Sequence, residues 1–118
     1  KDMLENNKEI SIVDDQHRMP TYVEDLALVC KLSIDKNIRG VYHVSSNELL
    51  SIFEIANQIA TVFGLDKNLI KPISTKTLNQ KAVRPLKTGF DLSKTTRDLE
   101  FHSTSFLEGL KRFKQTLT

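Results

Sequence analysis

Residues 14–27, which join an apolar run to an amphipathic segment, read Asp14-Asp15-Gln16-His17-Arg18-Met19-Pro20-Thr21-Tyr22-Val23-Glu24-Asp25-Leu26-Ala27. The apolar run before them, residues 10–13, has the composition of a short strand. Thr21 and Glu24 fit the capping-box pattern, in which two side chains satisfy free amides at the start of a helix. Pro20 ends any helix upstream of it. The stretch therefore predicts a strand, a short loop that holds Arg18, and a capped helix.

Arg18 is the candidate functional residue of this loop. A guanidinium is a planar fork that donates two parallel hydrogen bonds, so a proline-stiffened loop around it suits a fixed anion such as a phosphate. The spacing leaves a structural ion pair with Glu24 or Asp25 equally open. His17 precedes Arg18 and is a candidate for lining the same pocket.

The helix that follows is predicted to run to about residue 34, with an apolar stripe that contains Leu26, Ala27, Cys30 and Ile34. Within this stripe, Cys30 is interpreted as a small core hydrophobe. Residues 41–44 are β-branched and aromatic, which predicts a buried strand. His43 is then expected to be a core or sheet histidine.

A second capping box, formed by Ser51 and Glu54, opens a strictly periodic apolar segment that ends at Gly64. This pattern predicts a helix over residues 51–63 with a glycine at its C-terminal cap. Residues 69–73 are expected to form an edge strand, because a proline within them cannot donate to a ladder.

Residues 75–88 are polar and irregular, and they contain Arg84 followed by proline. Arg84 is a second candidate for anion binding, with a solvated surface arginine as the alternative. A short helix is expected over residues 92–99, capped by Asp91 or Ser93. The last helix opens at Ser105, and its inner face is predicted to contain Phe106, Leu107, Leu110, Phe113 and Leu117.

Alternating elements of this kind predict an α/β fold. About three short strands and three to four helices make a small, partial α/β unit, too small for a doubly wound sheet. Because no linker or repeat is evident, we expect one compact domain over residues 1–118. The chain opens inside an apparent helix at residues 3–8, so we expect a C-terminal part of a longer protein.

Several kinds of catalytic machinery are absent from the sequence. The four glycines are too far apart to form a phosphate-cradling loop. Neither tyrosine is followed by lysine at the fourth position, and no two histidines have metal-ligand spacing. We therefore expect no catalytic, cofactor-binding or metal-binding residues in this chain. The acids Asp14 and Asp15 are interpreted as turn-forming groups.

The net charge of +2 is too small to indicate a nucleic-acid or membrane partner. No apolar run approaches the ~18 residues of a membrane span. A single cysteine cannot form an internal disulfide, so a reducing cytoplasm is the expected location.

The stretch at residues 15–27 resembles the C-terminal region of dTDP-4-dehydrorhamnose reductases, which belong to the extended short-chain dehydrogenase/reductase superfamily. The resemblance continues in order. Further matching segments are Gly40-Val41-Tyr42-His43-Val44-Ser45-Ser46, Ser51-Ile52-Phe53-Glu54-Ile55-Ala56, Ala82-Val83-Arg84-Pro85-Leu86-Lys87-Thr88-Gly89-Phe90-Asp91 and Phe106-Leu107-Glu108-Gly109-Leu110.

This resemblance implies a parent protein with an N-terminal Rossmann domain that binds NAD(P)H, absent from this chain, and a catalytic Ser/Thr-Tyr-Lys set. Such a protein would reduce the 4-keto group of a dTDP-linked deoxysugar. The present chain resembles the smaller domain that closes over the nucleotide sugar, with Arg18 and Arg84 at positions where relatives approach the diphosphate. Many reductases of the family have another residue in place of Arg18. The resemblance therefore extends to epimerases, dehydratases and the regulatory methionine adenosyltransferase subunit.

Two functions are therefore expected from the sequence. The first is a nucleotide-sugar-binding lobe of a reductase, with no turnover by this chain alone. The second is a non-catalytic protein-association or regulatory module on the same scaffold. In either case, apolar surface left without its partner domain would permit homo-oligomers.

Overall fold

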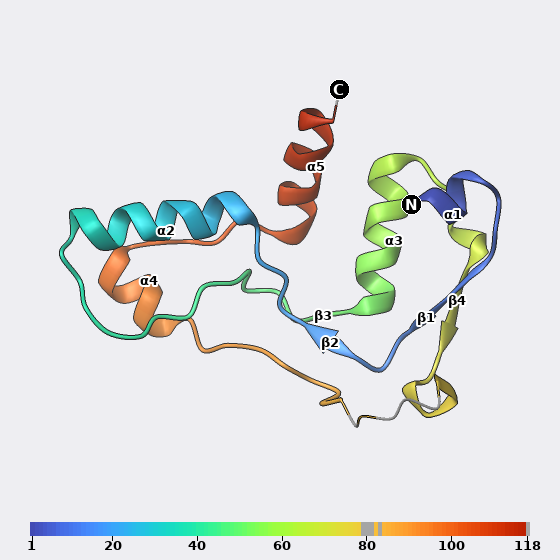
Figure 1. Cartoon of the computed structure of the whole chain (residues 1–118), viewed down its shortest axis with the longest axis horizontal. Coiled ribbons are helices and arrows are strands. Elements are labelled where there is room, and N and C mark those ends of the chain that lie inside the picture. The colour runs from blue at the N-terminus through green and yellow to red at the C-terminus, as the bar shows by residue number, and fades with distance from the viewer. Residues whose placement is uncertain (79–81, 83, 118) are drawn as a thin grey trace.

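A computed structural model describes residues 1–78, 82 and 84–117 of the chain. Figure 1 shows the elements in order along the chain. They are α1 (Asp2–Glu5), β1 (Ile10–Val13), β2 (His17–Arg18), α2 (Val23–Asp35), β3 (Leu50–Ser51), α3 (Ile52–Phe63), the 3-10 helix η1 (Lys67–Leu69), β4 (Ile70–Ile73), the 3-10 helix η2 (Thr75–Leu78), α4 (Ser93–Leu99) and α5 (Phe106–Thr116).

The helix α3 confirms the second capping box. The Glu54 amide donates to Ser51 Oγ at 3.0 Å, and the Ser51 amide donates to Glu54 Oε2 at 2.7 Å. Gly64 ends the helix in the left-handed conformation, with φ of 69°, which glycine adopts without a steric penalty. The boundaries therefore agree with the prediction to within one residue.

The four strands of the described residues form two separate pairs. In the first, β1 lies parallel to β4, with Ile10 opposite Ile70 and Ile12 opposite Pro72. In the second, β2 lies antiparallel to β3, with His17 opposite Ser51. The strands predicted at residues 10–13 and 69–73 are confirmed. The two-residue strands β2 and β3 are too short to give a periodic signal in the sequence.

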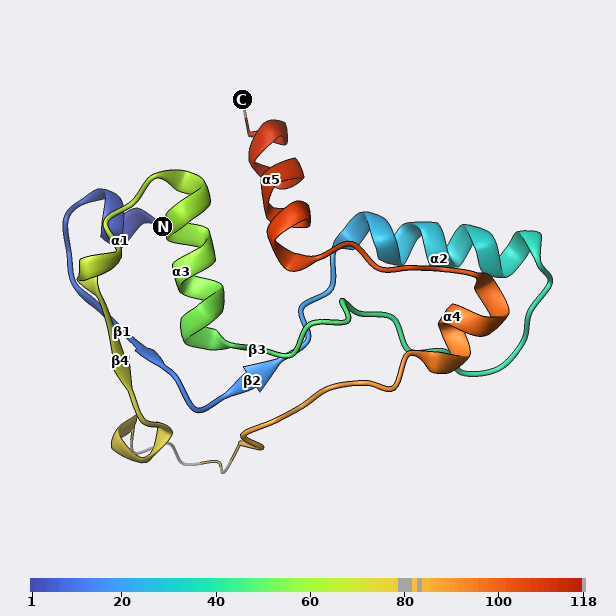
Figure 2. The same ribbon diagram turned by 180° about the vertical axis from the view of Figure 1, so that it is seen from behind.

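The described residues contain two hydrophobic clusters. Leu4, Ala60 and Ile70 form one, between α3 and the β1–β4 pair. The other lies between α2 and α4 and consists of Val29, Leu99 and Phe101. The two clusters lie at opposite ends of the molecule, and α5 lies between these ends, as views from both sides agree (Figures 1 and 2).

The molecule is flat and extended, with principal dimensions of 49 × 38 × 18 Å and a radius of gyration of 16.8 Å. A compact domain of this length has a radius of gyration of about 13 Å. The compact unit expected from the sequence is therefore not observed. The accessible surface is 8070 Å², compared with ~6,500 Å² for a monomer of this mass.

The strand predicted at residues 41–44 is wrong. The segment has no secondary structure, Val41 is 77% exposed and His43 is exposed and stacked on Phe90. Its carbonyl groups instead accept bonds from the side chains of Lys94, Thr95 and Thr21. A β-branched sequence forms a strand only when another strand pairs with it, and none of the described strands lies alongside.

Two expectations about α2 are also wrong. The helix is preceded by Tyr22 without a side-chain cap, because the Thr21 hydroxyl donates to the Val44 carbonyl instead. The predicted apolar stripe faces outward: Ile34 is 80% exposed, and Cys30 is exposed. The buried face contains Asp25 and Val29. The periodicity located the helix correctly but selected the wrong face.

The two C-terminal helices begin where expected. The N-cap residue of α4 is Leu92, which makes no side-chain cap bond, although Asp91 Oδ1 accepts from the Ser93 amide. Ser105 caps α5 by accepting from the Glu108 amide. The predicted inner face of α5 is only partly covered. Its exposed members are Leu107, Phe113 and Leu117. Within the described residues, no helix has the length and hydropathy needed to cross a lipid bilayer.

Candidate functional site

The strand β2 and the loop at residues 84–88 lie side by side. The His17 amide donates to the Leu86 carbonyl at 2.6 Å, and the Thr88 amide donates to the His17 carbonyl at 3.1 Å. A parallel bridge joins His17 to Lys87. The segment that begins at Arg84 is therefore held against the strand that contains Arg18, although 66 positions separate the two arginines in the sequence.

Arg18 is half-buried and hydrogen-bonded to neutral acceptors. Its Nη1 donates to the His17 carbonyl at 2.6 Å and to the Leu86 carbonyl at 3.4 Å. Its Nη2 donates to Gln16 Oε1 at 3.0 Å. The alternative ion pair is wrong, because Asp25 accepts from Thr104 and no described carboxylate pairs with Arg18. The guanidinium charge is therefore not neutralised by the described residues.

Arg84 is exposed, as is Lys87. No described residue accepts a hydrogen bond from the Arg84 side chain. Together with Arg18, these residues place three cationic groups on two adjacent segments. Their arrangement favours binding of an anion that reaches both segments, such as a diphosphate.

His17 contributes to the site through its backbone. His17 and Arg18 are consecutive residues of β2, and successive side chains of a strand point to opposite faces. The His17 Nδ1 is buried and has no hydrogen-bond partner among the described residues. The pKa of Glu54 lies below its ordinary value, mainly because the Ser51 amide donates to its carboxylate. The charge of the nearby His17 lowers this pKa by a smaller amount.

Two polar residues beneath the site, Asp15 and Gln16, were not identified as functional candidates. Gln16 is 5% exposed, and its Nε2 donates to Thr75 Oγ1 at 3.0 Å. Thr75 donates both its hydroxyl and its amide to Asp15, which also accepts from Ser74. These donors, with the Thr75 hydroxyl as the largest contribution, lower the pKa of Asp15 below its ordinary value. Asp15 lies in a bend, but its carboxylate bonds to residues about 60 positions away, so these contacts do not bear out its interpretation as a turn-forming group.

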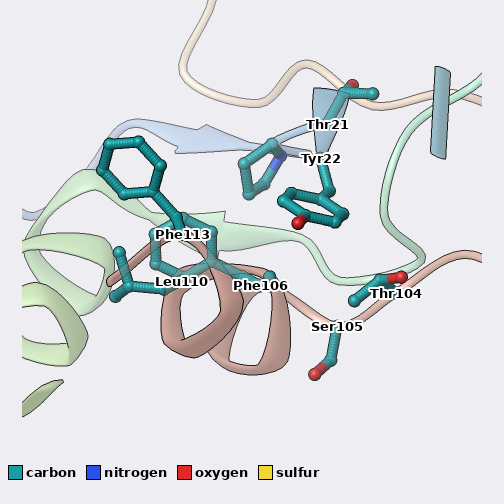
Figure 3. A pocket seen from close by; sticks show the side chains of 9 residues that line it. Thr21, Tyr22, Thr104, Ser105, Phe106, Leu110 and Phe113 are labelled. Atoms are coloured by element: carbon teal, nitrogen blue, oxygen red, sulfur yellow. The ribbon is translucent and has the colours of Figure 1, made fainter. Parts of the chain in front are cut away.

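A separate apolar cavity of about 170 Å³ lies between α5 and the residues that precede α2. Tyr22, Phe106 and Phe113 line it, as Figure 3 shows. Gly109 permits the close packing, because a Cβ at this position would lie 3.1 Å from Tyr22 Cδ2. The apolar spacing of α5 signalled a packing face, but the partner Tyr22 is distant in sequence.

Among the described residues, the unpaired guanidinium charge of Arg18 and the adjacent segment of Arg84 form a candidate anion site. Histidine, cysteine and acidic side chains do not gather there in a group of three or more that would hold a metal ion. The chemistry that Arg18 and Arg84 favour is charge-assisted hydrogen bonding to an anion.

Comparison with known proteins shows the family to which the chain belongs. The chain matches the family model for the RmlD substrate binding domain over residues 1–118. It is 31% identical over 127 residues to methionine adenosyltransferase 2 subunit beta of Xenopus laevis, a match that covers 95% of this chain and 38% of that protein. It is also 31% identical over 83 residues to spore coat polysaccharide biosynthesis protein SpsK of Bacillus subtilis, covering 70% of this chain and 29% of that protein.

Among solved structures, the dTDP-4-dehydrorhamnose reductase of Bacillus anthracis, determined in complex with NADP, matches with a TM-score of 0.88 and 32% identity. The match covers 98% of this chain and 41% of the reductase. The chain thus spans about two fifths of the length of that reductase and of the Xenopus relative. The α/β fold expected from the sequence is confirmed, and the chain belongs to the RmlD substrate-binding domain family.

Proposed function

We propose that this chain binds the diphosphate of a nucleotide sugar, as the substrate lobe of an NAD(P)H-dependent reductase that acts on a dTDP-linked 4-keto-deoxysugar. The observation that carries the proposal is the pairing of His17 with residues 86–88, which sets Arg18 beside the segment of Arg84. Family membership and the likeness to a reductase that binds NADP support the choice of substrate and cofactor. His17 takes part through its backbone, because its amide and carbonyl hold the second segment in place.

The lobe alone is expected to bind weakly. Two charge-assisted contacts contribute about 1.5–3 kcal/mol each. Immobilising the ligand costs at least ~4 kcal/mol. The difference leaves a dissociation constant that is millimolar or weaker for the isolated chain. In the whole enzyme, a Rossmann domain would supply the remaining contacts and the NAD(P)H.

An NMR titration with dTDP tests the proposal, with thymidine as the control ligand because it lacks the diphosphate. We expect the backbone amides of residues 16–18 and 84–88 to shift with a millimolar dissociation constant for dTDP and to stay unchanged with thymidine. Arg84→Gln should weaken dTDP binding about tenfold, since it removes one charge-assisted contact. Equal shifts with both ligands, or a low-micromolar affinity, would contradict the proposal.

The second candidate, a protein-association or regulatory module, is favoured by the exposed apolar face of α2 and by the methionine adenosyltransferase subunit among the relatives. We infer that further polypeptide, a Rossmann domain in the reductase case, covers this face. The sequence of the parent protein separates the candidates. A Gly-rich dinucleotide motif together with Tyr-x-x-x-Lys supports the reductase, and the loss of that tyrosine or lysine supports the module. In both cases we propose a cytoplasmic location, where Cys30 stays reduced.

A further inference from the structure

Gln16 is a buried amide whose two ends contact different parts of the fold. Its Oε1 accepts from Arg18 Nη2 at 3.0 Å, and its Nε2 donates to Thr75 Oγ1 at 3.0 Å. The residue is 5% exposed. A buried amide with both ends bonded keeps a fixed orientation, because rotation would leave polar atoms without partners.

Thr75, which accepts from the Gln16 side-chain amide, is itself held in place by Asp15. The Thr75 amide donates to both carboxylate oxygens of Asp15, at 3.1 and 2.9 Å, and its hydroxyl donates to Oδ1. Asp15 follows β1, and Thr75 follows β4, so the contact closes the end of the parallel pair. The position of Gln16 is therefore set by the sheet, which packs on α3.

At its other end, Gln16 fixes the guanidinium and leaves part of it available. Gln16 accepts one N–H of Nη2, and two backbone carbonyls accept from Nη1. The Nε–H and the second N–H of Nη2 have no partner among the described residues. Two donors on one guanidinium match two phosphate oxygens. Because Gln16 is neutral, it orients Arg18 without cancelling its charge.

We propose that Gln16 is the positioning residue of the anion site, a neutral amide that holds Arg18 in its binding orientation from the β1–β4 pair. This inference rests on the proposed function, since it concerns how the same guanidinium meets the diphosphate. It explains why a buried amide, and not a carboxylate, lies behind the arginine. A carboxylate would hold the guanidinium more strongly but would compete with the ligand for it.

Two substitutions separate these effects. Gln16→Met keeps the approximate shape and removes both hydrogen bonds, so Arg18 loses its orientation. Gln16→Glu keeps the acceptor for Arg18 and adds a negative charge. Gln58→Met is the matched control, because Gln58 is a half-buried glutamine on α3 whose Oε1 has no partner among the described residues.

The experiment measures dTDP affinity by NMR titration, thermal stability, and the guanidinium ¹⁵N spectrum of Arg18 in each variant. We expect Gln16→Met to weaken dTDP binding about three- to tenfold, the cost of ordering one long side chain again, and to average the Arg18 Nη signals. Gln16→Glu should keep those signals ordered and yet weaken binding more. Gln58→Met should bind as the wild type does.

If Gln16 had only a structural role, Gln16→Met would lower the melting temperature. The dTDP affinity measured below that temperature would then be unchanged. Wild-type affinity in Gln16→Met, in a protein whose affinity falls on Arg18→Gln, would overturn the inference and leave the proposed function standing. An unchanged affinity in Gln16→Glu would likewise overturn it. If wild-type protein shows no dTDP-dependent shift at residues 16–18, the proposed function fails and the inference fails with it.

Discussion

At the scale of single residues, Asp15 links the site to the stability of the fold. Its carboxylate accepts from three donors, which are the Thr75 hydroxyl, the Thr75 amide and the Ser74 hydroxyl. These bonds, with the Thr75 hydroxyl as the largest contribution, lower the pKa of Asp15 below the ordinary value of 3.8. The folded state therefore binds a proton on Asp15 less readily than the unfolded state. The contribution of the Asp15 carboxylate to the free energy of unfolding is present above the pKa of the unfolded state. It is lost as the pH falls through the lower pKa of the folded state.

Urea unfolding of the wild type and Asp15→Asn between pH 3 and pH 6 tests this linkage. We expect Asp15→Asn to have the lower urea midpoint at pH 6, with a difference that narrows as the pH approaches 3. Asp14→Asn, at the exposed neighbouring carboxylate, is the control and should change the midpoint little. A difference between wild type and Asp15→Asn that stays constant over this range would show that proton binding by Asp15 is not involved.

The candidate site could be predicted from the sequence only in part. Arg18 and Arg84 were identified because an arginine in a proline-containing loop is a local signal. The pairing of their two segments depends on backbone bonds between His17 and residues 86–88, and local patterns contain no information about such bonds. Gln16 was missed for the same reason, since its role becomes visible only through Thr75, which lies 59 positions away.

At the scale of elements, two similar sequence patterns behave differently. Ser51 and Glu54 form both bonds of a capping box, whereas the Thr21 hydroxyl donates to the Val44 carbonyl and α2 has no side-chain cap. We expect Ser51→Ala to lower the free energy of unfolding by about 1 kcal/mol, the usual cost of an N-cap. Thr21→Ala should cost less than about 0.5 kcal/mol, because its bond at 3.3 Å is exposed. Chemical denaturation of both variants measures the difference, and equal costs would contradict the assigned caps.

Helices were predicted more reliably than strands, for a physical reason. The boundaries of α3 depend on bonds within about four residues, so Ser51 and Gly64 are sufficient to locate them. A strand depends on a partner, and the segment at residues 41–44 has none among the described residues. The inner face of a helix depends on its neighbours too, which is why α2 buries Asp25 and exposes Ile34.

At the scale of the whole molecule, the exposed surface is too large for an isolated monomer. The observed 8070 Å² exceeds the value typical of this mass by about 1,500 Å². A standard interface buries ~800 Å² on each partner. Part of the exposed apolar surface lies on α2, where Val23 is 71%, Leu26 is 46% and Ile34 is 80% exposed. A surface of this composition favours association when no other polypeptide covers it.

We therefore expect the 118-residue chain to self-associate through the exposed face of α2 when it is studied alone. Ile34→Glu places a charge on the exposed apolar face of α2, so it should reduce association at least tenfold without lowering the free energy of unfolding. Sedimentation velocity across a range of protein concentrations measures this effect. Leu117→Glu, at a residue 58% exposed beyond the end of α5, is the matched control. If both variants dissociate the assembly equally, apolar exposure in general and not the α2 face drives association, and a chain that stays monomeric throughout would contradict the prediction altogether.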